Sequence, residues 1–149
     1  YTSPRGGTTI SEGEGNNGII VVHPEQLEVD AVSGAMVRLG GVSRNLTGAQ
    51  GIHMGLSTIP PDCSSTPHRH TNCESAIYVV SGHGKMLMGP GLEQSQDFGP
   101  GDFIYVPAYA LHQPVNTDSN EPVVLVIARN SPVEVVEEYS GSAAGQPHG

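Results

Sequence analysis

Short apolar runs recur along residues 18–128, separated by clusters of Gly, Pro, Asn and Asp. None of them keeps a helical period over about ten residues, whereas apolar or alternating runs of roughly four to eight residues between turn signals are typical of strands. The pattern therefore predicts an all-β fold. The expected strands cover residues 19–22, 35–39, 52–59, 75–81, 85–88, 102–106, 111–116 and 123–128.

The two ends of the chain lack this pattern. Residues 1–17 are rich in Gly, Ser and Thr, which predicts a flexible N-terminal arm. Residues 131–149 pass through an acidic run and end in Gly, Ser and Ala, which predicts a tail with at most one helical turn over 133–139. We therefore expect one β-barrel domain over residues 18–130, because a chain of 149 residues has the ordinary size of a single compact domain.

The charge balance excludes some classes of partner. Six Lys and Arg residues against fifteen Asp and Glu residues give a formal net charge of -9, so we expect no nucleic-acid partner. No run reaches the roughly 20 apolar residues that a membrane-spanning helix needs, so we expect no membrane partner. No basic segment followed by an apolar one opens the chain, which favours a cytoplasmic protein.

The two cysteines, Cys63 and Cys73, flank a pair of histidines. Their spacing allows a disulfide bridge, whereas an intracellular compartment would keep both thiols reduced. Two cysteines do not make a disulfide-dense secreted scaffold. The sequence leaves both alternatives open.

The histidine pair His68 and His70 is the first candidate site. Side chains on a strand alternate, so both imidazoles face the same side, and Glu74 returns to that side if regular pleating continues past a possible kink at residues 71–72. Two imidazoles and one carboxylate suit a first-row divalent transition metal better than Ca²⁺ or a thiolate zinc site. Taken alone, the pair fits solvated histidines in a Pro-rich turn equally well.

A second segment contains Gly101, Pro107, His112 and Asn116. Together the two segments resemble the cupin family, whose first motif runs Gly, five residues, His-x-His, three or four residues, Glu, six residues, Gly. The family's second motif runs Gly, five residues, Pro-x-Gly, two residues, His, three residues, Asn. The histidine pair with Glu74 fits the first motif, and the second segment fits the second motif.

The resemblance implies an all-β cupin fold, a double-stranded β-helix or jelly-roll-like barrel. It also implies one divalent metal ion held by His68, His70, Glu74 and His112, for which Fe, Mn or Ni is favoured and Zn, Co or Cu is an alternative. Asn116 lies outside this ligand set and is expected to be structural. A homodimer is implied as well, because cupins frequently exchange strands or pack sheet against sheet.

The chain departs from the family pattern at three turn positions. Asp62 stands where the first motif begins with Gly, Ser81 stands where it ends, and Tyr109 replaces the Gly of Pro-x-Gly. A positive φ at such a turn is costly for a bulky side chain. Tyr109 could place a phenol at the pocket mouth to hydrogen-bond a substrate, although a tolerated turn residue is the simpler interpretation.

The alternation of side chains along the predicted strand indicates which residues line the pocket. If Glu74 faces inward, Ala76, Tyr78 and Val80 do so too and form an apolar or aromatic wall. A small dicarboxylate would need a firm arginine clamp, and the core strands offer only Arg38 and Arg129. These features favour a small, chelating, partly apolar organic substrate.

We therefore predict a metal-dependent oxidoreductase of the dioxygenase type, with Glu74 and Tyr109 as candidate catalytic residues. A metal with open coordination positions can bind O₂ or a chelating substrate. A non-oxidative lyase, decarboxylase or isomerase, in which Glu74 shifts between ligand and base, is one alternative. A small-molecule-binding module without turnover is the other.

Overall fold

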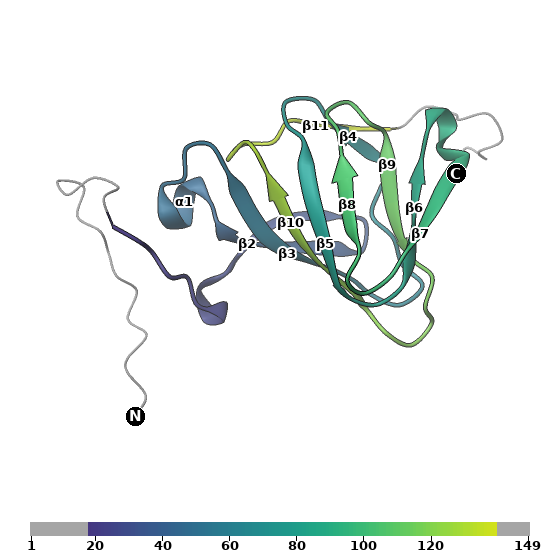
Figure 1. The fold of residues 1–149 in the computed structure, drawn as a ribbon, viewed down its shortest axis with the longest axis horizontal. Helices are drawn as coiled ribbons and strands as arrows, with labels where there is room; N and C mark the ends of the chain where they lie inside the picture. The colour runs from purple at the N-terminus through teal and green to yellow at the C-terminus, as the bar shows by residue number, and fades with distance from the viewer. Residues whose placement is uncertain (1–17, 140–149) are drawn as a thin grey trace.

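The computed structural model describes residues 18–139 and folds them into two antiparallel sheets that face each other (Figure 1). The six-stranded sheet has the order β1 (Glu28–Ser33), β2 (Met36–Val42), β3 (His53–Ile59), β10 (Val123–Arg129), β5 (Ser75–Ser81) and β8 (Phe103–Val106). The five-stranded sheet has the order β11 (Val136–Glu138), β4 (His68–His70), β9 (His112–Asn116), β6 (Gly84–Met88) and β7 (Gln94–Phe98). This arrangement confirms the all-β prediction.

Among residues 18–139, helical structure is confined to short segments. They are α1 (Arg44–Thr47) and two 3-10 turns at Pro24–Gln26 and Pro90–Leu92. Within residues 18–139, no helix is long and apolar enough to cross a membrane. The expected N-terminal arm, residues 1–17, lies outside the described residues.

The core lies between the two sheets and follows the alternation of the strands. On β5, for example, Ser75, Ile77 and Val79 are buried while their neighbours are exposed. Burying one large apolar side chain contributes about 1.5–3 kcal/mol, so the cluster stabilises the packing of one sheet on the other. Its members are Met36, Ile59, Ile77, Val79, Met86, Phe98, Val106, Val123 and Leu125.

Strands that carry core residues match the predicted ranges closely, and the mismatches lie elsewhere. The apolar run at 19–22 does not form a strand, and Ile19 is 98% exposed. The strands β1, β7 and β11 were not predicted. All three are edge strands: β7 and β11 are mostly polar, and in β1 a register shift between Val29 and Ala31 interrupts the alternation of apolar residues.

The C-terminal segment corrects the predicted domain boundary. Residues 131–139 continue the barrel, and β11 replaces the helical turn that the sequence allowed. It pairs with the histidine strand β4, with Val136 opposite His70 and Glu138 opposite His68. The pairing places this segment directly beside the candidate site.

Candidate metal centre

The three histidines of the two motifs come together on adjacent strands. His68 and His70 lie on β4, and His112 lies opposite His68 at the start of β9. All three side chains are buried, and one ring nitrogen from each lies within 4.8 Å of the others. Their ring centroids are 4.5–5.4 Å apart. This part of the predicted ligand set therefore forms a compact group.

Oxygen atoms fix the orientation of the three rings. His68 and His112 each place Nδ1 beside the backbone carbonyl oxygen two residues earlier, at 2.7 and 2.8 Å. A carbonyl can only accept, so these Nδ1 atoms carry the proton and Nε2 keeps a free lone pair. His70 Nδ1 lies 3.1 Å from a carboxylate oxygen of Glu134. Metal-binding histidines typically place their other ring nitrogen beside such a carbonyl or carboxylate oxygen.

Burial keeps the imidazoles of His68 and His112 neutral. Burial lowers the pKa of His68, and burial together with the neighbouring His68 lowers the pKa of His112 to about 3. A neutral imidazole is the form that coordinates a metal. Three converging imidazole nitrogens fit a first-row divalent ion.

The same pKa shifts predict that the metal-free protein loses stability in acid. The pKa of His112 is lower in the folded state than its ordinary value of 6.5, so the unfolded chain binds the proton more readily as the pH falls. The free energy of unfolding should therefore drop by about 1.4 kcal/mol per pH unit between roughly pH 6 and pH 4 from this residue alone. Urea unfolding of chelator-treated protein at several pH values measures the slope. His112→Gln should make it shallower, and equal slopes would contradict the assignment.

The structure does not bring Glu74 to the three histidines. Its side chain is exposed and accepts a hydrogen bond of 2.8 Å from the Tyr105 hydroxyl. The next buried residue after His70 is Cys73, three positions later instead of two. The alternation of buried and exposed residues is therefore shifted by one position before β5 begins. The prediction that Ala76, Tyr78 and Val80 line the pocket is therefore wrong, because these side chains point to the exterior.

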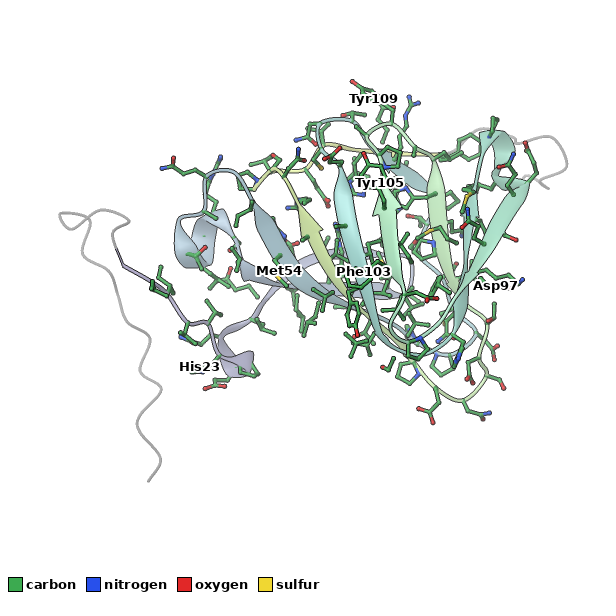
Figure 2. The ribbon with its side chains drawn as sticks, in the orientation of Figure 1. His23, Met54, Asp97, Phe103, Tyr105 and Tyr109 are labelled. Atoms are coloured by element: carbon green, nitrogen blue, oxygen red, sulfur yellow. The ribbon has the colours of Figure 1, made fainter. Side chains whose placement is uncertain are left out.

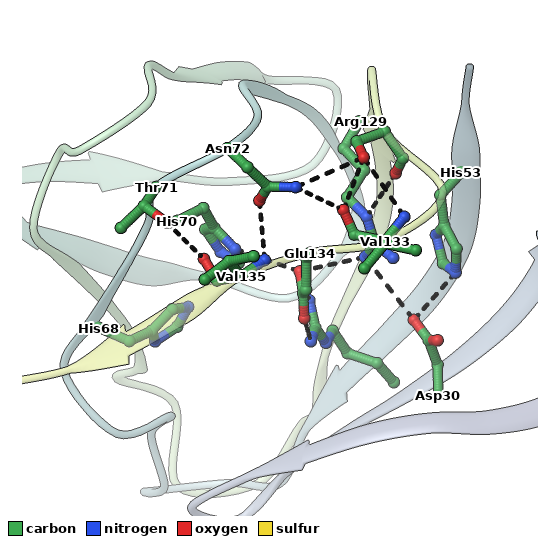
Figure 3. Close-up of polar contacts among 12 residues, drawn as sticks. Asp30, His53, His68, His70, Thr71, Asn72, Arg129, Val133, Glu134 and Val135 are labelled. Carbon is green, nitrogen blue, oxygen red and sulfur yellow. Dashed lines mark hydrogen bonds and ion pairs between the residues drawn. The ribbon is translucent and has the colours of Figure 1, made fainter. Parts of the chain in front are cut away.

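Hydrogen bonds made by residues 71–72 explain this shift in the alternation. The Thr71 amide donates to the backbone oxygen of Val135 at 2.9 Å, and Asn72 Nδ2 donates to that of Val133 at 2.7 Å (Figure 3). These bonds tie the turn after β4 to the C-terminal segment instead of to a continuing strand. The possible kink considered from the sequence is therefore present.

Glu134 is the carboxylate that lies beside the histidines. It is held between two buried guanidinium groups, those of Arg38 and Arg129, and it faces His70 (Figure 3). Arg129 in turn lies 3.8 Å from Asp30. In the sequence Glu134 lies in the predicted acidic tail and was not a candidate site residue. No local pattern indicates a contact between β2 and a residue 96 positions later.

The partners of Glu134 keep it ionised. Burial alone would raise its pKa, but hydrogen bonds from His70 and Arg38 and the charges of both arginines outweigh burial and hold the pKa far below the ordinary value. Both core arginines are thereby engaged by a carboxylate of the chain itself. They are not free to clamp an anionic ligand while this contact persists.

Tyr109 stands in the turn between β8 and β9. Its φ is 67°, so the backbone keeps the left-handed conformation although the residue is not glycine; Asp62 does the same with a φ of 57°. The Tyr109 amide donates to the His70 carbonyl at 2.7 Å, which links this turn to the histidine strand. Its ring is exposed at the upper rim of the molecule (Figure 2).

Asn116 and the cysteines have structural environments. Asn116 is 1% exposed, and its Nδ2 donates to three backbone oxygens at 2.8–3.1 Å, so it anchors loops as expected. Cys63 and Cys73 are not bridged. Burial raises the pKa of Cys73, which leaves it a protonated thiol at neutral pH.

Two cavities adjoin the histidine group. The inner one, between the two sheets, has a volume of about 30 Å³ and is lined by all three histidines, Glu134 and both arginines. That is the volume of one water molecule, so it accommodates an ion or a water but no organic substrate. The outer one is a cleft of about 1210 Å³ between the edge strands β7 and β8. Met86, Val106 and His112 line both cavities.

The cleft is aromatic and acidic. Its lining includes Phe98, Phe103, Tyr105, Tyr109 and Tyr139. Four carboxylate residues also line it, against a single basic residue, Arg69, whose Nε donates to Glu137 at 2.8 Å. Such a cleft favours an uncharged or cationic ligand with apolar surface over an anion.

Comparison with known proteins assigns the family. A family model described as the cupin domain matches residues 55–128. The chain belongs to the cupin family, as the two histidine motifs predicted.

Solved structures share this fold. The polyketide cyclase RemF from Streptomyces resistomycificus is 18% identical, with a TM-score of 0.68 over 80% of this chain and 84% of that chain. Oxalate decarboxylase from Lactobacillus farciminis is 21% identical, with a TM-score of 0.67 over 79% of this chain; the match spans only 35% of the decarboxylase. A protein from Acidithiobacillus ferrooxidans described as a candidate sugar phosphate isomerase is 30% identical, with a TM-score of 0.54 over 68% and 65% of the two chains. At identities near 20%, such likeness concerns the fold alone.

Proposed function

We propose that this cupin is a metal-dependent oxidoreductase of the dioxygenase type, acting on a small, uncharged, partly aromatic substrate that chelates the metal. The observation that carries the proposal is the shared wall of the two cavities. His112 belongs both to the histidine group and to the lining of the aromatic cleft. A substrate in the cleft would therefore reach the metal from the side of His112.

His68, His70 and His112 would hold the metal through three imidazole nitrogens. We propose Fe, Mn or Ni, and the Bacillus subtilis oxalate decarboxylase of the same fold, 22% identical, has Mn(II) centres. When bound, such an ion orients a chelating oxygen donor and, as Fe or Mn, supplies redox chemistry toward O₂.

The two carboxylates considered as bases near the histidine group, Glu134 and Glu74, are both poorly suited to isomerisation and related proton transfers. Among the described residues, the carboxylate beside the histidines is Glu134, and its two arginine partners make it a weak proton acceptor. Glu74 points to the exterior. An uncharged, weakly acidic enol or phenol that loses its proton on binding the metal needs no such base, which favours reaction with O₂.

The charge of the site restricts the substrate class. Oxalate or a sugar phosphate would meet the carboxylates of the cleft, and the two core arginines are occupied by Glu134. Flavonols, catechols and β-diketones are uncharged or weakly acidic, are planar, and chelate through adjacent oxygens. The free thiols Cys63 and Cys73 suit a reducing compartment, so we also propose a cytoplasmic location.

The test is a substrate screen with the Fe²⁺, Mn²⁺ and Ni²⁺ forms that records O₂ uptake and product mass together. We expect O₂ consumption with at least one uncharged chelator and none with oxalate or sugar phosphates. His112→Ala serves as the inactive reference. Turnover of the same substrates without O₂ would move the assignment to a lyase, cyclase or isomerase. Metal-dependent binding without turnover would indicate a binding module.

A further inference from the structure

A thin wall separates the histidine group from the cleft. The inner cavity of about 30 Å³ holds an ion or a water, whereas the cleft of about 1210 Å³ holds an organic molecule. The three residues that line both cavities are buried: Met86 is 4% exposed, Val106 is 5% exposed and His112 is 7% exposed. A chelating molecule in the cleft therefore reaches the histidine group where this wall opens.

Two of the three wall residues are held in place. His112 places its Nδ1 atom 2.8 Å from the Ala110 carbonyl oxygen, and a bound metal would hold its Nε2 atom. Val106 is branched at Cβ and lies on β8, and few χ1 rotamers are open to such a side chain. Neither residue is suited to move out of the wall.

Met86 is the movable residue of the wall. Its side chain is unbranched and has three rotatable bonds, so it adapts its shape at low cost. On β6 it pairs with Gln96 of β7, the strand that borders the cleft. The open volume of the cleft lies on one side of Met86, so the thioether has room to turn away from the histidines.

We propose that Met86 is the gate of the metal centre, and that its movement into the cleft admits a chelating molecule to the ion. The inference rests on the proposed function, because it takes the histidine group as the metal site and the cleft as the substrate site. Val106 and His112 border the opening that Met86 leaves. Met86 is therefore a specificity-determining residue, because the width of a chelating molecule decides whether it reaches the ion.

Two other methionines are matched controls, because each lines one of the two cavities. Met36 lines the inner cavity and is as buried as Met86, with 3% of it exposed. Met88 lines the cleft and stands two residues from Met86 on the same strand, directly opposite His112. Alanine removes the same atoms at all three positions, but at Met86 alone it removes part of the shared wall.

Release of Fe²⁺ to o-phenanthroline without O₂ measures access to the ion, because this chelator is flat, is uncharged and forms a coloured complex. A wall that is open for less than about a tenth of the time slows entry by that fraction, so Met86→Ala should release Fe²⁺ about tenfold faster than the wild type. Met36→Ala and Met88→Ala should stay within about threefold of the wild type. Met86→Leu keeps the volume with fewer rotatable bonds, so it should release Fe²⁺ more slowly.

The results separate this inference from the proposed function. A wild-type chain that binds no divalent metal would overturn both. Metal binding with equal release rates for Met86→Ala and Met36→Ala would overturn the gate alone, because loosened packing would then explain the rates. Circular dichroism and Fe²⁺ content verify that each variant is folded. If Met86→Ala does not fold, Met86→Leu decides, and release from it at the wild-type rate would overturn the gate.

Discussion

Replacing His112 by alanine is expected to weaken metal binding by about 100-fold or more. Removing a group that only orients a ligand lowers metal affinity by roughly 10- to 100-fold, and His112 itself supplies one of the three converging donors. Competition of Co²⁺ or Mn²⁺ between the protein and a chromophoric chelator measures the affinity. His83→Ala removes a histidine outside the group and should leave the affinity unchanged. Equal affinities of the wild type and His112→Ala would show that the ion binds elsewhere.

Glu74→Gln distinguishes the two possible ligand sets. The family spacing predicts Glu74 as a fourth ligand, whereas the structure places its carboxylate on the exterior beside Tyr105. We expect the metal affinity to change by less than about threefold, because the Glu74 carboxylate bonds to Tyr105 and is not part of the histidine group. A loss comparable to that of His112→Ala would establish Glu74 as a ligand.

Glu134→Gln is expected to weaken metal binding and destabilise the fold together. The carboxylate orients His70, so we expect the metal affinity to fall by about 10- to 100-fold. It also neutralises Arg38 and Arg129, and leaving buried charges unpaired costs roughly 3 kcal/mol or more. Urea unfolding and the chelator competition assay measure the two effects separately.

Glu137→Gln is the matched control for this change. Glu137 pairs with Arg69 on the surface, where about half of each side chain is exposed, and such pairs contribute about 1 kcal/mol at most. Its loss should leave metal affinity unaltered. If Glu134→Gln destabilised the protein but kept the wild-type affinity, the role of Glu134 would be confined to packing. Glu134→Asp, which keeps the charge, should recover part of both properties.

Sequence reasoning succeeded where the residues that fix the structure are close together in the chain. The strand at 75–81 was predicted with both of its limits, because Ile77 and Val79 alternate with exposed neighbours. The histidine group was also predictable: His68 and His70 share a strand face, and the second motif supplies His112 from the adjacent strand. Motif spacing therefore gave three of the four proposed ligands a common location.

Features that depend on contacts between distant segments of the chain could not be predicted. The position of Glu74 depends on a change of phase imposed by bonds from Thr71 and Asn72 to the C-terminal segment. The position of Glu134 depends on partners from β2 and β10. The polar edge strands had no alternation to detect. Each of these features is set by tertiary pairing, which a local pattern of residues does not encode.

The closure of the barrel by residues 131–139 has a consequence for folding during synthesis. Arg38 emerges from the ribosome 96 residues before Glu134, and until then its guanidinium group lacks the carboxylate that pairs with it in the folded protein. Because contacts this far apart in the chain form slowly, the histidine strand would remain an unprotected edge until β11 arrives. Full affinity for the metal should thus appear only in chains synthesised through Glu138, so a barrel released earlier would bind metal weakly and be prone to aggregate.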